Sequence, residues 1–235
     1  MTDLCQVVEK VLERRRSAPA AQSLLVALSG IDGAGKGYLG EQLVAALRER
    51  GLNAVLITID PWLNLPATRF SAERLAEQFY WNAIRFEEMF EKLVLPLKRN
   101  RSVRVEAEVA EETATEFCRY TYEFSDVDVI VLEGIYLLRR DLRRHYDFSF
   151  WIECSFETAL ERAIRRAQEG LPPAETIRAY QTIYFPAQLI HFALDEPWAA
   201  ADLVISNDPL LTVPDAPANP WYLPAARPPM TLEMT

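Results

Sequence analysis

Four glycines and one lysine lie within an eight-residue segment near the start of the chain, GIDGAGKG from Gly30 to Gly37. The segment matches the pattern G-x-x-x-x-G-K between Gly30 and Lys36. Glycines let the backbone wrap so that successive N–H groups point at one anion, and the lysine reaches the outer phosphates of a nucleotide. The spacing therefore predicts the phosphate-binding chemistry of a P-loop.

The residues on either side of this loop fit the prediction. Leu24 to Leu28 is a short apolar run typical of a buried strand, and a helical pattern begins at Leu39. A helix that starts after the loop adds partial positive charge at the phosphate position. Gly37 departs from the pattern, because a Ser or Thr normally stands there and binds Mg²⁺ through its hydroxyl.

Two acidic residues stand at the ends of predicted buried strands. Asp60 follows residues 54–59, and Glu133 lies near the end of residues 127–134. Ligands of parallel sheets bind beyond the carboxyl ends of the strands, where the glycine loop also lies. Asp60 could take a proton from an acceptor hydroxyl or hold Mg²⁺, and Glu133 has the position of a Walker B acid. The alternatives are a turn cap for Asp60 and a strand-end ion pair for Glu133.

A predicted helix carries three arginines, Arg162, Arg165 and Arg166. Guanidinium groups match phosphate oxygens, and small-molecule kinases carry such arginines on a helical lid. The alternative is a solvated basic face, because glutamates alternate with the arginines.

Alternating strands and helices predict an α/β fold with a doubly wound parallel sheet of five strands. The expected strands are residues 24–28, 54–59, 127–134, 148–154 and 202–206, and the expected helices are residues 3–16, 71–81, 85–97, 156–169 and 174–194. Between residues 101 and 124 the apolar period changes to two, which predicts an inserted antiparallel hairpin. We divide the chain into an N-terminal helix (1–22), a P-loop domain (23–206, with a lid region at about 156–173) and a proline-rich tail (207–235).

Composition excludes several classes of partner. The 235 residues carry a formal net charge of -9, which argues against nucleic acid, since phosphate backbones need a basic face. Three widely spaced cysteines fit reduced thiols, and there is neither an apolar leader nor a membrane-length apolar run. We therefore expect a cytoplasmic protein without nucleic-acid or membrane partners, and leave a homo-oligomer open.

The chain resembles the uridine kinase and phosphoribulokinase family of P-loop kinases. The resemblance extends from about Leu24 to Ser206. It is carried by the P-loop, Asp60, the LEG run that ends at Gly134, the hairpin, and the runs YQTIYFP (180–186) and ADLVI (201–205). The family's His-Pro-Asp-Ala-Phe-Asp segment and the Gly-Arg-Asp turn of its lid are absent. Thymidylate kinases share the IDGAGK run but rank lower.

The resemblance implies a P-loop kinase fold and an ATP- and Mg²⁺-dependent transfer of phosphate to the hydroxyl of a small metabolite. It implies Asp60 as catalytic base, aided by Lys36, Arg162 and Arg166, with Asp60 and Glu133 as metal ligands. The implied ATP-binding residues are Gly30, Ile31, Asp32, Gly33, Ala34, Gly35, Lys36, Gly37, Tyr38 and Arg165. The candidates for acceptor binding are Tyr80, Asn82, Arg85, Arg119 and Tyr120.

Three hypotheses for the function follow. A nucleoside such as uridine is the first acceptor, and another small alcohol, such as pantothenate or a sugar phosphate, is the alternative. Gly37 motivates the third hypothesis, a nucleotide-binding regulatory protein without catalysis, because the missing hydroxyl weakens Mg²⁺ placement. Against it, Lys36, Asp60 and Glu133 all remain, and water could supply the missing ligand.

Overall fold

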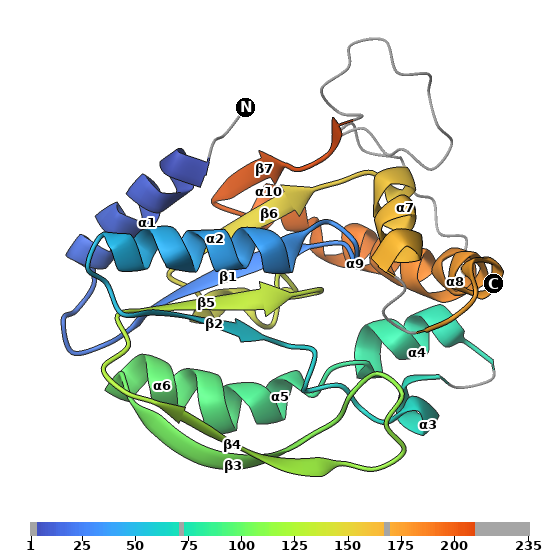
Figure 1. Ribbon diagram of the computed structural model, residues 1–235, viewed down its shortest axis with the longest axis horizontal. Coiled ribbons are helices and arrows are strands. Elements are labelled where there is room, and N and C mark those ends of the chain that lie inside the picture. Colours follow the sequence, from blue (N-terminus) through green and yellow to red (C-terminus); the bar gives the residue numbers. More distant parts are fainter. Residues whose placement is uncertain (1–3, 71–72, 167–169, 210–235) are drawn as a thin grey trace.

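The computed structural model describes residues 4–70, 73–166 and 170–209, in which a five-stranded sheet lies between helices (Figure 1). All neighbouring strands of this sheet are parallel, in the order β2-β5-β1-β6-β7. The strands are β1 (Leu24–Gly30), β2 (Ala54–Thr58), β5 (Val129–Gly134), β6 (Phe148–Glu153) and β7 (Leu203–Ser206). The predicted five-stranded parallel α/β sheet is confirmed, with the strand before the P-loop at its centre.

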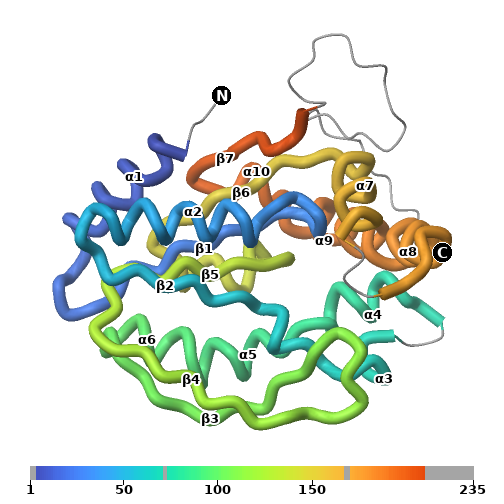
Figure 2. The backbone as a smooth tube through the Cα atoms, in the orientation of Figure 1, coloured from blue at the N-terminus to red at the C-terminus, as the bar shows by residue number. Residues whose placement is uncertain are grey.

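Helices cover both faces of the sheet (Figures 1 and 2). On one side lie α1 (Leu4–Ser17) and α2 (Lys36–Glu49). On the other runs a continuous helix made of α5 (Phe86–Met89), the π-helical turn η1 (Phe90–Val94) and α6 (Leu95–Asn100). The strands β3 (Val103–Val109) and β4 (Cys118–Phe124) form an antiparallel hairpin that packs against this helix. The predicted hairpin is thereby confirmed.

The remaining helices gather beyond the carboxyl ends of the strands or along the sheet edge. They are α3 (Pro66–Arg69), α4 (Leu75–Asn82), the 3-10 turn η2 (Arg143–His145), α7 (Phe156–Arg166), α8 (Pro173–Ala179), the π-helical turn η3 (Tyr180–Tyr184), α9 (Phe185–Asp195) and α10 (Pro197–Ala200). The predicted ends of two helices, at residues 71–72 and 167–169, fall outside the described residues, as does most of the tail. Within the described ranges, no helix has both the length and the apolarity needed to cross a bilayer.

The sheet is buried because it is covered on both faces. Every residue of β1 and of β5 is buried, which explains why both strands appear in the sequence as unbroken apolar runs. The helices α1 and α2 contribute only one apolar face each, such as Val7 and Val11 in α1.

Two prolines explain the two π-helical turns. Pro96 and Pro186 follow η1 and η3 by two residues, inside helices that continue past them. A proline ring clashes with the carbonyl four residues earlier and cannot donate to it, so a wider turn accommodates it. The widened turn before Pro186 lies in the helix that reaches the cavity described below.

Gly134, the last residue of the LEG run, has to be glycine because the core leaves no space for a side chain. A Cβ atom at Gly134 would lie 2.3 Å from Cδ1 of Ile59, whose side chain is fully buried. We expect Gly134→Ala to lower the free energy of unfolding by about 1–3 kcal/mol, because the core is already filled there. Urea denaturation measures the loss.

Gly37→Ala is the matched control. A Cβ at Gly37 has no neighbouring atom within 4 Å, and the residue lies in the first turn of α2, where alanine is favoured over glycine. Its stability should equal or exceed that of the unchanged chain. Equal stability of the two alanine variants would contradict the packing argument.

Candidate active site

Two glycines of the loop leave no room for a side chain, because two other segments of the chain contact the loop closely. Gly33 and Gly35 have φ angles of 77° and 87°, in the left-handed region that favours glycine. A Cβ at Gly33 would lie 2.5 Å from the carbonyl oxygen of Ala159 in α7. A Cβ at Gly35 would lie 2.5 Å from Nδ2 of Asn207, just after β7. The fold therefore fixes the loop in the wrapped shape that a phosphate requires.

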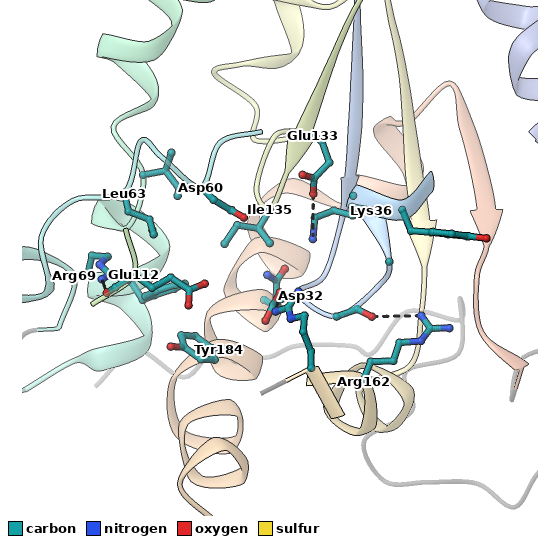
Figure 3. A pocket seen from close by; sticks show the side chains of 18 residues that line it. Asp32, Lys36, Asp60, Leu63, Arg69, Glu112, Glu133, Ile135, Arg162 and Tyr184 are labelled. Carbon is teal, nitrogen blue, oxygen red and sulfur yellow. Dashed lines mark hydrogen bonds and ion pairs between the residues drawn. The ribbon is translucent and has the colours of Figure 1, made fainter. Parts of the chain in front are cut away.

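Lys36 lies at the start of α2 and faces the interior of the loop. Its Nζ donates to the carbonyl oxygen of Ile31 at 3.0 Å and lies 4.0 Å from Oε1 of Glu133 (Figure 3). Glu133 is buried at the end of β5, and this burial raises the pKa of its carboxyl group. The positive charge of Lys36 lowers the pKa of Glu133, and the negative charge of Asp60 raises it further.

Asp60 lies directly beyond β2. The amide of Ile59 still donates to the carbonyl oxygen of Glu133 at 3.0 Å, so the alignment of β2 with β5 continues almost to Asp60. Surrounding protein desolvates the Asp60 carboxyl group and raises its pKa, Lys36 lowers it, and Asp32 raises it further. The group is thus a carboxylate with strengthened affinity for a proton or a cation.

One cavity of about 340 Å³ joins these side chains. Ten of the residues singled out from the sequence line it: Asp32, Gly33, Gly35, Lys36, Gly37, Tyr38, Asp60, Glu133, Arg162 and Arg166. Three other loop residues, Gly30, Ile31 and Ala34, are buried and do not line the cavity. Arg165 is exposed and lies outside the cavity.

The five residues expected to bind an acceptor do not line this cavity. The Tyr80 side chain is buried, and its hydroxyl donates to Oδ2 of Asp195 at 2.5 Å. The Asn82 carbonyl oxygen accepts a bond from Asn64, while the Arg85 guanidinium donates to Glu88 and to the carbonyl oxygen of Glu108.

The two hairpin candidates are directed to solvent. Arg119 pairs with Glu106 at 3.3 Å across the hairpin, with its side chain 77% exposed, and Tyr120 is 55% exposed. Because successive residues of a strand point to opposite faces, Arg119 and Tyr120 lie on different faces of β4, yet both side chains are exposed. The five residues thus lie outside this cavity, and their part in acceptor binding stays a prediction.

Two lid arginines contact the P-loop from α7. Arg162 donates to the carbonyl oxygens of Gly33 and Ala34, at 3.4 and 3.3 Å, and to that of Asn207 at 2.8 Å. Arg166 pairs with Asp32 at 3.5 Å. Its pKa is raised by Asp32 against the opposing effect of burial. Arg162 therefore supports the loop, while Arg166 sits half exposed at the rim of the cavity.

The first residues assigned to the tail belong to the site. Asn207 donates through Nδ2 to the carbonyl oxygen of Ala34 at 2.8 Å. Asp208 is buried and accepts bonds from the amide of Ser155 and the hydroxyl of Thr158, in the first turn of α7. The ordered contacts thus extend past the boundary that we drew at residue 206.

Eight residues outside the predicted set of site residues also line the cavity. They are Leu63, Arg69, Phe79, Ile84, Glu112, Ile135, Tyr184 and Gln188. One signal was available for part of this set, because Tyr180, Tyr184 and Gln188 recur every four residues and share a helix face. Tyr180 donates to the carboxylate of Asp32, and the other two line the cavity.

Comparison with known proteins gives structural matches only. No protein-family model matches the chain, and no curated protein matches it in sequence. A proposed uridine kinase from Bacillus stearothermophilus superposes with a TM-score of 0.66 at 20% identity, over 87% of this chain and 100% of that one. A candidate fructose transport system kinase from Silicibacter sp. TM1040 gives 0.65 at 25% identity, with the same coverage.

A D-glycerate 3-kinase from Cryptococcus neoformans gives a TM-score of 0.58 at 12% identity, over 88% of this chain and 96% of that one. These structures share the overall fold of this chain over 87–88% of its length. The chain thus has the α/β fold of these kinase structures.

Proposed function

We propose that the protein is an ATP-dependent kinase that transfers the γ-phosphate of ATP to a hydroxyl group of a small metabolite. The observation that carries the proposal is the convergence of Lys36, Asp60 and Glu133 on one cavity, from three neighbouring strand ends. Phosphoryl transfer needs a phosphate cradle, a cation at the outer phosphates and a group that orients the acceptor. The kinase names of the structural neighbours agree with this combination.

The residues fit ATP at the P-loop end of the cavity. The wrapped loop, the start of α2 and Lys36 form the cradle, and Arg166 at the rim is free to move from Asp32 toward a phosphate, since its side chain is half exposed. Tyr38, 66% exposed beside the loop, and Arg165 remain proposed nucleotide contacts.

The donor set also fits Mg²⁺. Carboxylates are the protein ligands that Mg²⁺ takes, usually one or two together with substrate phosphates. Asp60 and Glu133 would hold the ion, and the surrounding protein raises the pKa of both carboxyl groups, which increases the gain from a nearby cation. When bound, Mg²⁺ supplies charge neutralisation at the transferring phosphate.

Asp60 is the proposed base. It lies at the junction of the P-loop side and the side lined by Leu63 and Ile84, where an acceptor hydroxyl would meet the phosphate. A raised pKa brings a carboxylate closer to the acidity that proton transfer at neutral pH requires. Its carboxylate therefore accepts or orients the proton of the acceptor hydroxyl.

The acceptors proposed from the sequence, a nucleoside first and another small alcohol second, share a hydroxyl bound to carbon. Among the neighbours, one name refers to uridine, one to fructose transport and one to glycerate. The second candidate function is nucleotide binding without catalysis, and Gly37 is the observation that favours it.

Lys36→Ala should abolish ATP turnover and weaken ATP binding at least tenfold, because the outer phosphates lose their cation. The measurement is ATP consumption with Mg²⁺ across a panel of nucleosides, sugars and small alcohols, with Lys92→Ala, an exposed lysine, as control. Unchanged turnover in Lys36→Ala would remove the P-loop from the mechanism.

Asp60→Asn separates chemistry from binding. It should leave the affinity for ATP within a few-fold while lowering kcat by about 10²–10⁴, the usual contribution of a general base. Asp141→Asn serves as control, because Asp141 is an exposed carboxylate that pairs with Arg139 and does not line the cavity. If the affinity for ATP falls and kcat does not, Asp60 is not the base and acts only as a metal ligand or a turn cap.

Gly37→Ser tests the third hypothesis. The side chain has room, since nothing lies within 4 Å of a Cβ there, and its hydroxyl can add a Mg²⁺ ligand. We expect the Mg²⁺ concentration for half-maximal activity to fall several-fold, whereas Gly37→Ala leaves it unchanged. An inactive parent with an active serine variant would support the non-catalytic hypothesis instead.

A further inference from the structure

The carboxamide of Gln188 is buried in the wall of the cavity without a partner. The residue is 2% exposed and lines the same cavity as Asp60. Its Oε1 has no hydrogen-bond partner among the described residues. Gln188 follows Tyr184 by one helical turn, just past the π-helical turn that precedes Pro186. Gln188 therefore brings an amide oxygen without a partner among the described residues to the wall of the cavity.

An unpaired amide at this depth is unfavourable for folding alone. Buried polar groups in native proteins are nearly always hydrogen-bonded, and each exception needs an explanation. A leucine or methionine would fill a similar volume without this cost. A ligand in the cavity that bonds to the amide supplies the explanation.

The chemistry of an amide indicates which ligand groups fit. A carboxamide offers one acceptor and one donor group without charge, which complements a hydroxyl group. A phosphate or carboxylate on the ligand would instead call for a cation such as lysine or arginine. Gln188 thus favours a hydroxyl-bearing ligand.

The charged groups on the acceptor side of the cavity also favour a ligand without charge. Figure 3 places Arg69, Glu112 and Tyr184 on the side of the cavity away from Arg162. Together with Asp60, these lining groups comprise two carboxylates and one guanidinium. The Arg69 guanidinium also donates to the backbone carbonyl of Glu112. Two carboxylates stand against one guanidinium, and that guanidinium is already bonded to the carbonyl oxygen of Glu112, so this side has an excess of negative charge and an uncharged acceptor fits better than an anionic one.

We propose that the acceptor is an uncharged polyhydroxylated molecule and that Gln188 binds a hydroxyl other than the one that receives the phosphate. The proposal rests on the proposed function and narrows its acceptor class. It excludes sugar phosphates and hydroxy acids, and retains sugars and nucleosides. Gln188 is then a specificity-determining residue that holds the acceptor beside Asp60.

Gln188→Met tests this with little change in volume, and Gln181→Met, on an exposed turn of the same helix, is the control. The probes are uridine and D-fructose against D-fructose 6-phosphate and D-glycerate, with Mg²⁺ and ATP. Gln188→Met should raise KM for a neutral acceptor about tenfold. Without any ligand its melting temperature should equal or exceed that of the unchanged chain, because the unpaired amide is gone.

Three results would overturn the proposal. The first is a lower melting temperature of Gln188→Met, which would mean that the amide stabilises the fold. The second is an unchanged KM for the neutral acceptor, and the third is turnover of only the anionic probes. The last result leaves the kinase proposal standing. If ATP binds and no probe is turned over, the proposed function fails. Calorimetry of uridine and D-fructose with a non-hydrolysable ATP analogue then decides the binding proposal. A binding heat that is lost in Gln188→Met supports it, and no binding heat with either probe overturns it.

Discussion

The parallel hydrogen bonding of β2, β5 and β1 is the constraint on which the site depends. In this register Glu133 lies opposite Thr58 on one side and opposite Leu28 on the other. The ends of the three strands therefore lie at one level of the sheet, and the residues just beyond them have to share one space. Because β1 and β5 are buried on both faces, a shift of register would misfit their side chains against the packed helices, so packing holds the alignment.

A second layer of contacts fixes the loop itself. Asn207 and Arg162 bind its carbonyl oxygens, and Tyr180 and Arg166 bind the Asp32 carboxylate. These partners come from three helical or strand ends far apart in the sequence. They bind carbonyl oxygens of the loop and the Asp32 carboxylate, so these contacts use acceptor groups of the loop and not the N–H groups that a phosphate needs. The wrapped loop is thus preorganised by the rest of the fold.

The cavity has two chemically different ends. The P-loop side gathers Lys36, Arg162 and Arg166, which suits a polyphosphate. The opposite side combines apolar walls with an unpaired amide, two carboxylates and one guanidinium, which suits a hydroxyl-rich molecule without charge. Asp60 lies between them, where transfer from one ligand to the other would take place. The P-loop and the arginines of α7 shape the first end, while residues from α3, the hairpin loop and α9 shape the second.

The sequence by itself determined the sheet, the hairpin, the P-loop and the acidic residues after two strands. These features depend on local patterns: apolar runs, a period of two, and glycine spacing. The acceptor side was decided only by the tertiary structure. Arg69, Glu112 and Gln188 come from α3, the hairpin loop and α9, and no local pattern links them. Tyr80 and Arg85 looked suitable by type, yet their polar groups are used in internal bonds. A side chain's direction and partners depend on packing between distant segments, which spacing along one segment does not encode.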